Sequence, residues 1–266
     1  MMPLLHSKAA TVYYAHVPKA GGTSIEDYLI AQFGPLSLYD PYWTARSQPG
    51  WPQKFACSDQ HLVWADACAL MESPPDLVFG MVRDPLGRVI SEYRFQSRHN
   101  RKMGWLTRRG FSVWLAVMER ALGADPYIFD NHLRPQSDFL PDHAQVFRLE
   151  EGMAPLCDWL HAQLGGERAA LPHAQKASDP LQVMPTAADL ARVARMYRAD
   201  YARFFYALPA SPAHALSGPA SRNLTPALPP GSISAPKTGG ASGLVQSCLA
   251  TVLGPATAWA YRQNRI

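Results

Sequence analysis

The segment that most constrains the fold of this chain is a glycine-rich loop between a predicted strand and a predicted helix. The strand is the β-branched and aromatic run 11–17, and the helix is indicated by apolar residues at helical spacing over 25–33. Thr23 or Ser24 is expected to cap this helix, and Gly34-Pro35 to end it. The loop between strand and helix reads His16-Val17-Pro18-Lys19-Ala20-Gly21-Gly22-Thr23-Ser24.

This loop has the features of an anion-binding site. Successive glycines let backbone N–H groups approach an anion, and the helix N-terminus behind them carries roughly half an elementary positive charge. Lys19 adds an ammonium group, and the hydroxyl groups of Thr23 and Ser24 can donate hydrogen bonds. The sequence therefore predicts a phosphate-binding loop over 18–24, although a Gly-Gly turn can also be purely structural.

The position of the lysine separates this loop from that of magnesium-dependent nucleotidases. A Walker A loop has its lysine after the second glycine, beside a hydroxyl that binds magnesium. Here Lys19 precedes Gly21 and Gly22. The order favours a transfer reaction in which lysine, rather than a metal ion, neutralises the phosphate, and no metal is expected.

A second strand-to-helix junction follows the continuous apolar run 77–82, which is typical of a strand buried on both faces. Asp84 is expected to cap the next helix, with Pro85 at its first position. Arg83 can make a bidentate contact to a second phosphate, and Ser91 can reach the same group from the helix. Arg88, one turn before Ser91, is the alternative to Arg83.

Further strands and helices alternate along the chain. The patterns predict strands over 55–58 and 144–149, and helices over 62–71, 111–122, 153–164 and 187–205. This alternation predicts an α/β fold, a P-loop-NTPase-like three-layer sandwich with a central parallel sheet flanked by helices. Ligands are then expected where the carboxyl ends of the strands meet helix N-termini.

Composition indicates one globular domain followed by a different kind of segment. Residues 1–208 mix apolar and charged side chains, 209–243 are rich in Ala, Ser, Pro and Gly and read as a linker, and 244–266 read as a short apolar helix or tail. This tail is a poor membrane span because Gly254-Pro255 interrupts it. Docking on the domain or a partner is the simpler expectation, and weak membrane contact the alternative.

Charge and cysteine content exclude several classes of protein. The net charge of +4 is too small to indicate a nucleic-acid partner, although basic residues cluster between 83 and 109. The 4 cysteines lack the CxxC spacing of zinc sites and are too sparse for a disulfide framework. With no secretory signal visible in residues 1–10, a cytoplasmic protein with reduced thiols is expected.

Together the two junctions resemble the paired motifs of sulfotransferases that use 3′-phosphoadenosine 5′-phosphosulfate (PAPS). The likeness is greatest to the carbohydrate-type family that contains heparan sulfate 2-O-sulfotransferases and bacterial relatives, and it spans roughly 11–208. It implies that Pro18 to Ser24 hold the 5′-phosphosulfate and that Arg83 and Ser91 bind the 3′-phosphate. Asp84 departs from the family pattern, in which Asn is common. The motifs are His16-Val17-Pro18-Lys19-Ala20-Gly21-Gly22-Thr23-Ser24 and Val82-Arg83-Asp84-Pro85-Leu86-Gly87-Arg88-Val89-Ile90-Ser91-Glu92-Tyr93.

The reaction implied is in-line transfer of a sulfuryl group to an acceptor hydroxyl, for which a base and a cation near the leaving phosphate are needed. We expect His61 to be the base, with His132 as its rival, and Lys19 to stabilise the bridging oxygen. His132, Arg134 and Gln136 are expected to bind the acceptor. The resemblance implies a carbohydrate acceptor, and the basic cluster is compatible with a negatively charged saccharide without selecting it.

Three other side chains near these motifs are given structural roles. His16 is expected to pack against its strand. Glu26 and Glu92 are further candidates for the base, but their helix positions favour roles at the helix dipole and on the surface. Two other functions stay open at this point. A P-loop kinase using ATP would depend on magnesium, and a non-catalytic module binding nucleotide or glycan would not transfer sulfate.

Overall fold

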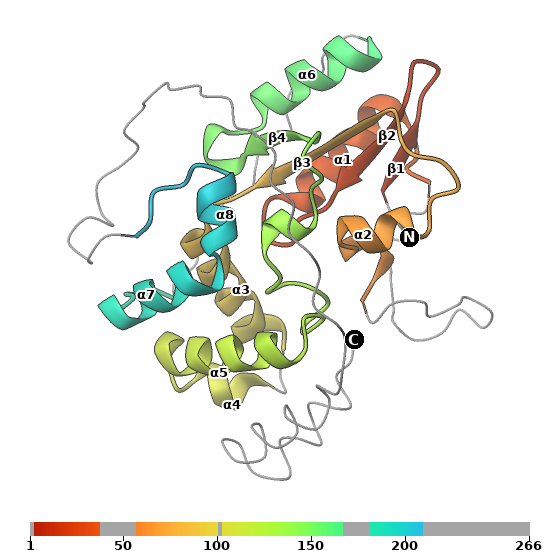
Figure 1. The fold of residues 1–266 in the computed structure, drawn as a ribbon. Coiled ribbons are helices and arrows are strands. Elements are labelled where there is room, and N and C mark those ends of the chain that lie inside the picture. The colour runs from red at the N-terminus through yellow and green to blue at the C-terminus, as the bar shows by residue number, and fades with distance from the viewer. Residues whose placement is uncertain (1–2, 38–56, 101–102, 167–180, 210–266) are drawn as a thin grey trace.

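The computed structural model describes residues 3–37, 57–100, 103–166 and 181–209 (Figure 1). Its sheet has the strand order β1-β2-β3-β4, with β1 antiparallel to β2 and the other neighbours parallel. The carboxyl ends of β2, β3 and β4 therefore meet at one edge. The strands are β1 (Leu4–His6), β2 (Thr11–Ala15), β3 (Leu77–Val82) and β4 (Gln145–Arg148).

Helices cover the sheet and extend beyond it. The predicted helix over 187–205 is divided at Tyr197, and the one predicted over 62–71 is a short helix after a 3₁₀ turn. The α-helices are α1 (Gly22–Phe33), α2 (Trp64–Cys68), α3 (Pro85–His99), α4 (Gly104–Thr107), α5 (Phe111–Ala124), α6 (Ala154–Leu164), α7 (Ala187–Met196) and α8 (Arg198–Arg203). The 3₁₀ turns are η1 (Asp59–His61), η3 (Gln136–Asp138) and η4 (Leu149–Glu151).

The sheet carries apolar side chains on both faces, which agrees with the predicted layers. Alternate residues of β2 separate to the two sides, because successive side chains of a strand point in opposite directions. Val12 and Tyr14 pack in a cluster with α1 and α6, whereas Tyr13 and Ala15 pack with α2 and with Phe139. The result is a mixed α/β fold with a mostly parallel sheet flanked by helices (Figure 1).

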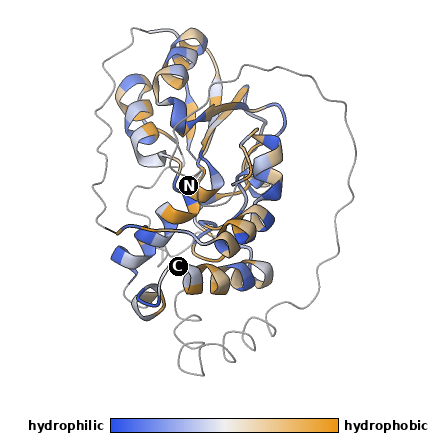
Figure 2. Cartoon of the chain, turned by 90° about the vertical axis from the view of Figure 1, so that its left-hand side faces the viewer, coloured by the Kyte–Doolittle hydropathy of each residue, from blue (hydrophilic) through white to orange (hydrophobic). Residues whose placement is uncertain are grey.

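A third apolar cluster lies among helices rather than on the sheet. It joins α3, α4, α5, α7 and α8 around the fully buried Trp114 and Tyr197. Along the helices of the molecule, segments of hydrophobic residues alternate with segments of hydrophilic residues (Figure 2). This helical layer matters for the site because it holds one side of α3, whose other side faces the edge of the sheet.

Two expectations about strands need correction. The strand predicted over 55–58 is wrong for its described residues, since Cys57 and Ser58 lie outside the strands and lead into η1. The edge strand β1 was not predicted, and it makes the sheet mixed rather than wholly parallel. The P-loop-like detail of the expected fold stays a prediction.

The C-terminal predictions lie almost wholly outside the described residues. Of the linker assigned to 209–243 only Pro209 is described, and the tail assigned to 244–266 is not described. Within the described part of the chain, no helix combines the length and the apolar character that a membrane crossing needs.

Candidate functional site

The first junction, between β2 and α1, presents backbone N–H groups. Lys19 and Gly21 both have left-handed backbone angles, with φ of 68° and 91°. Helix α1 starts at Gly22 with Gly21 as its N-cap, so the prediction that Thr23 or Ser24 caps the helix is wrong. No side chain caps this helix. The N–H groups of its first turn therefore remain available to an anion.

The loop rests on His16, which leaves no room for a side chain at Gly22. A Cβ atom built on Gly22 would lie 2.0 Å from Nε2 of His16. His16 is buried, as expected, and its Nδ1 lies 2.6 Å from Oε1 of Glu26. A carboxylate only accepts hydrogen bonds, so Nδ1 carries the proton and Nε2 faces the loop. Burial lowers the pKa of His16, which favours the neutral imidazole.

Lys19 lies on the side of the loop that faces α3. Its Nζ is 4.0 Å from the centroid of the Phe95 ring, a cation–π contact. Burial lowers the pKa of Lys19, and the nearby carboxylate of Glu92 opposes this shift. Because Lys19 is partly buried, few water molecules would compete with a bound anion for its ammonium group.

The second junction, between β3 and α3, contributes a guanidinium group. Asp84 accepts a hydrogen bond of 2.8 Å from the Gly87 N–H with Pro85 at the first helical position, which confirms the predicted cap. Arg83 donates from NH1 to the Lys19 carbonyl at 3.4 Å, so the two junctions touch. Burial lowers the pKa of Arg83, although Glu150 opposes the shift.

Arg88, the alternative phosphate ligand, has a different role. Its side chain projects from α3, is buried, and donates to the carbonyl oxygens of His132 (3.0 Å) and Arg134 (2.5 Å). Its guanidinium also lies 5.2 Å from the Tyr197 ring. Arg88 therefore holds the 132–134 segment in place. Ser91, half-buried on α3, remains compatible with the role expected for it.

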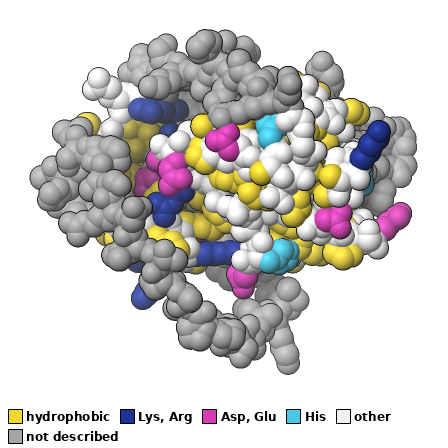
Figure 3. All heavy atoms as spheres, turned by 90° about the horizontal axis from the view of Figure 1, so that it is seen from above, with side chains coloured by type: hydrophobic (Ala, Val, Ile, Leu, Met, Phe, Trp, Pro, Cys, Tyr) yellow, Lys and Arg dark blue, Asp and Glu magenta, His cyan; other side chains and the backbone are white. Residues whose placement is uncertain are grey.

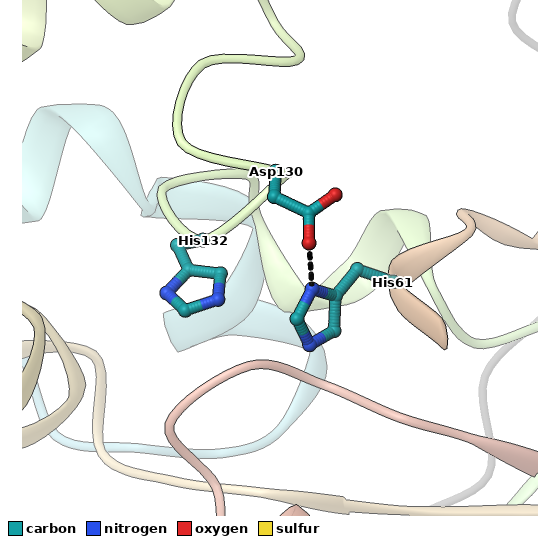
Figure 4. Close-up of side chains that lie close together, drawn as sticks. All are labelled: His61, Asp130 and His132. Atoms are coloured by element: carbon teal, nitrogen blue, oxygen red, sulfur yellow. Dashed lines mark hydrogen bonds and ion pairs between the residues drawn. The ribbon is translucent and has the colours of Figure 1, made fainter. Parts of the chain in front are cut away.

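Three histidines line up beside the loop, and each is bonded to a carboxylate. His61 Nδ1 lies 2.6 Å from Oδ2 of Asp130, and His132 Nδ1 lies 2.8 Å from Oε2 of Glu92. The ring of His61 is 4.8 Å from that of His16 and 4.8 Å from that of His132, edge to face in both cases. Asp130 sits over His61, whose second nitrogen points away from it (Figure 4).

The carboxylates of this cluster are held in their charged form. Burial alone would raise the pKa of Asp130, but the charge and the hydrogen bond of His61 hold it well below its ordinary value. Glu92 has the same balance, with His132 lowering its pKa against the effect of burial. Both Glu92 and Glu26 are buried, so the expectation that they serve the surface is wrong.

The donor set could also hold a metal ion. One ligand atom from each of His61, Asp130 and His132 lie within 4.8 Å of one another. Imidazole and carboxylate groups are ligands that zinc accepts. Both imidazoles already bond a carboxylate through Nδ1, so an ion would bind these rings through Nε2. The expectation that the reaction needs no metal stays a prediction.

The residues expected to bind the acceptor are divided between two environments. His132 belongs to the histidine cluster, whereas Gln136 is fully buried and bonds both N–H and carbonyl of Arg83, at 2.9 and 2.8 Å. Arg134 bonds Asp138 at 2.8 Å. Gln136 therefore supports the backbone of the second junction. The expectation that His132, Arg134 and Gln136 bind the acceptor stays a prediction.

Sequence reasoning missed the partners of the histidines. Asp130, Glu92 and Glu26 were not grouped with them, because the three pairs join residues 69, 40 and 10 positions apart. The only signal was local: Asp130 and His132 flank Asn131 in a polar segment. Seen from above, most basic side chains lie toward the left of the described surface, whereas acidic side chains occur on the left and on the right (Figure 3).

Comparison with known proteins places this geometry in a family. Residues 3–155, which contain both junctions and the histidine cluster, match the model described as the sulfotransferase family. The chain belongs to the sulfotransferase family. Searches of curated proteins and of solved structures give no match. Membership in this family identifies the chain as a transferase of sulfuryl groups to a hydroxylated acceptor.

Proposed function

We propose that this sulfotransferase uses PAPS as donor and a carbohydrate hydroxyl as acceptor, and releases adenosine 3′,5′-bisphosphate. The observation that carries the proposal is the closeness of the anion-binding loop to an imidazole. His16 lies directly beneath Gly22, and the His61 ring is 4.8 Å from the His16 ring. A base and an anion site side by side are what sulfuryl transfer to a hydroxyl requires.

The residues at the first junction suit the phosphosulfate group. Glycine at 21 and 22 leaves the backbone open, the helix N-terminus has no capping side chain, and Lys19 supplies a cation in a poorly hydrated position. We assign Pro18 to Ser24 to the phosphosulfate. Arg83 and Ser91 are assigned to the 3′-phosphate, since Arg83 reaches the Lys19 carbonyl from the neighbouring junction.

Each residue has a stated task in the transfer. Nε2 of His61 accepts the proton of the acceptor hydroxyl as its oxygen bonds to sulfur. The bond between sulfur and the bridging oxygen breaks in the same step, and Lys19 neutralises the charge that develops on that oxygen. His132 is assigned to bind the acceptor beside the base, because the centroid of its ring lies 4.8 Å from that of the His61 ring.

The test is transfer from radiolabelled PAPS to a panel of saccharides, measured for the wild type and for His61→Ala. We expect His61→Ala to abolish turnover while the calorimetric affinity for adenosine 3′,5′-bisphosphate changes only a few-fold. His143→Ala, at an exposed histidine, is the matched control. Near-normal turnover of His61→Ala would exclude His61 as the base. If His61→Ala retained turnover and His132→Ala lost it, the role of base would pass to His132.

A further inference from the structure

The segment that carries His132 and Asp130 has an unusual backbone. Phe129, Asp130 and Asn131 have φ values of 50°, 59° and 63°, so three successive non-glycine residues are left-handed. Left-handed backbone angles are disfavoured for residues other than glycine, less so for Asp and Asn, and persist only where the surroundings hold them.

Neighbouring elements hold this left-handed turn from several sides. The Asp130 carboxylate accepts from the backbone N–H of Ser58 and, at 2.7 Å, from the Ser58 hydroxyl. Arg88 binds the carbonyl of His132, and the Tyr197 hydroxyl donates to the carbonyl of Leu133 at 2.8 Å. The conformation is therefore imposed by α3, α7 and the segment before η1.

The turn is bonded to His61 twice. Asp130 bonds the imidazole Nδ1, and the buried Asn131 donates from Nδ2 to the His61 carbonyl at 2.8 Å. One contact fixes the backbone of His61 and the other fixes its ring. A turn that orders both the backbone and the ring of one residue is expected where that residue's orientation matters to the reaction.

We propose that Asp130 is a positioning residue, whose carboxylate keeps the proton of His61 on Nδ1 and so leaves Nε2 unprotonated and directed away from the turn. This inference rests on the proposed role of His61 as the base. A neutral imidazole holds one proton on either nitrogen, and only the unprotonated nitrogen can accept another. The carboxylate selects the tautomer because it can only accept a hydrogen bond.

The structure specifies what Asp130→Asn would do. The Ser58 N–H, which can only donate, faces Oδ1 of residue 130, so the amide oxygen of an asparagine would take that place. The amide nitrogen would then face His61 Nδ1 and could only donate to it. His61 would carry its proton on Nε2, the tautomer that cannot act as base.

The test combines a spectroscopic and a kinetic measurement on the full chain. Protein labelled with ¹⁵N-histidine is examined by two-bond ¹H–¹⁵N correlation, with the His61 signals assigned by their loss in His61→Gln. We expect the Nδ1–H tautomer in the wild type and the Nε2–H tautomer in Asp130→Asn. Turnover of Asp130→Asn with PAPS and the saccharide panel should fall about 10²–10⁴-fold, with little change in KM.

Two matched variants separate this effect from general damage. Asp142→Asn, at an exposed carboxylate, should leave the His61 tautomer and turnover unchanged. Glu92→Gln makes the same chemical change at the other pair. Because Gln96 donates to Oε1 of Glu92, the new amide nitrogen would face His132, and the tautomer of His132 should change while that of His61 does not.

Several outcomes would overturn the proposal. An Nε2–H tautomer in the wild type does so without any variant, and so does wild-type turnover of Asp130→Asn. Loss of turnover with an unchanged tautomer also overturns it, because the loss would then be structural. If instead His61→Ala retains turnover, His61 is not the base and Asp130 cannot act on the reaction through it, whereas failure of the wild type to transfer sulfate from PAPS to any saccharide would reject the proposed function and leave the tautomer measurement to test Asp130.

Discussion

The two strand-to-helix junctions of this sulfotransferase differ in how their helices begin. Helix α1 starts behind Gly21 without a capping side chain, whereas α3 starts behind Asp84, whose carboxylate accepts the Gly87 N–H. The positive end of α1 is thus open to an external anion, and that of α3 is already occupied. The second junction must offer charge through a side chain, and Arg83 provides it.

This difference determines which amino-acid substitutions each junction tolerates. A site made of backbone N–H groups depends on the space around them, so small residues and the left-handed angles of Lys19 and Gly21 are essential. A site made of one guanidinium depends on that side chain and its supports. Gln136 supplies such support because its side-chain amide accepts from the N–H of Arg83 and donates to the Arg83 carbonyl.

Among changes at the two junctions, Lys19→Ala is expected to have the largest effect, and the effect is on the rate. The variant leaves the backbone cradle but removes the cation near the bridging oxygen, and comparable losses of transition-state stabilisation cost about 10²–10³ in kcat. Affinity for adenosine 3′,5′-bisphosphate should fall much less, as calorimetry can show. Lys8→Ala, at an exposed lysine, serves as control. A rate within a few-fold of wild type would contradict the role of Lys19.

Arg83→Ala should act on binding rather than on rate. Loss of a charge-assisted contact to phosphate costs about 1.5–3 kcal/mol, or roughly 10- to 100-fold in affinity for adenosine 3′,5′-bisphosphate. Arg109→Ala removes an exposed arginine of the same basic cluster and should bind normally. Unchanged calorimetric affinity of Arg83→Ala would reject the assignment.

Gly22→Ala tests whether space limits the first junction. The new Cβ would overlap His16, whose ring is buried and bonded to Glu26, so the free energy of unfolding should fall by about 1–3 kcal/mol. Gly123→Ala is the control, since a Cβ there meets open space within α5. Denaturant unfolding measures both. Equal stability of the two variants would show that His16 moves aside at no cost.

The smallest effect is expected from Asp84→Asn. Burial raises the pKa of Asp84, so the folded state binds its proton more readily than the unfolded state does. Stability from this group therefore decreases as pH rises from the unfolded pKa through the folded one. Asparagine retains the cap but cannot ionise. The variant should be slightly more stable than wild type at pH 7 and lose this advantage near pH 4, in parallel denaturant titrations.

The parts of the site that were predicted from the sequence are the local ones. The glycine loop, the cap at Asp84 and the apolar strand 77–82 each lie within a few residues, where propensity and turn chemistry act directly. The start of α1 was misplaced by a few residues. Ser and Thr are common caps, but here the left-handed Gly21 takes that position.

The histidine cluster could not be predicted in the same way. His61 was chosen from its place after a presumed strand, and that strand is absent at Cys57 and Ser58. Its partner Asp130 is brought to it by three successive left-handed residues, a conformation that the sequence does not predict even though Asp and Asn adopt such angles more readily than most residues. Glu92 reads as a surface residue on a helix, and only the packing of α3 against the 132–134 segment buries it.

The buried Arg88 also affects how mutational scans of this enzyme should be interpreted. An alanine scan of the basic residues would place Arg88 among the most damaging positions, because its loss frees two carbonyl groups of the segment that carries His132. Its defect would extend to turnover, nucleotide affinity and stability together, whereas that of Arg83 would be confined to affinity. If these arginines were ranked by the severity of their defects alone, the scan would single out Arg88, which supports the fold, rather than Arg83, which is proposed to contact the nucleotide.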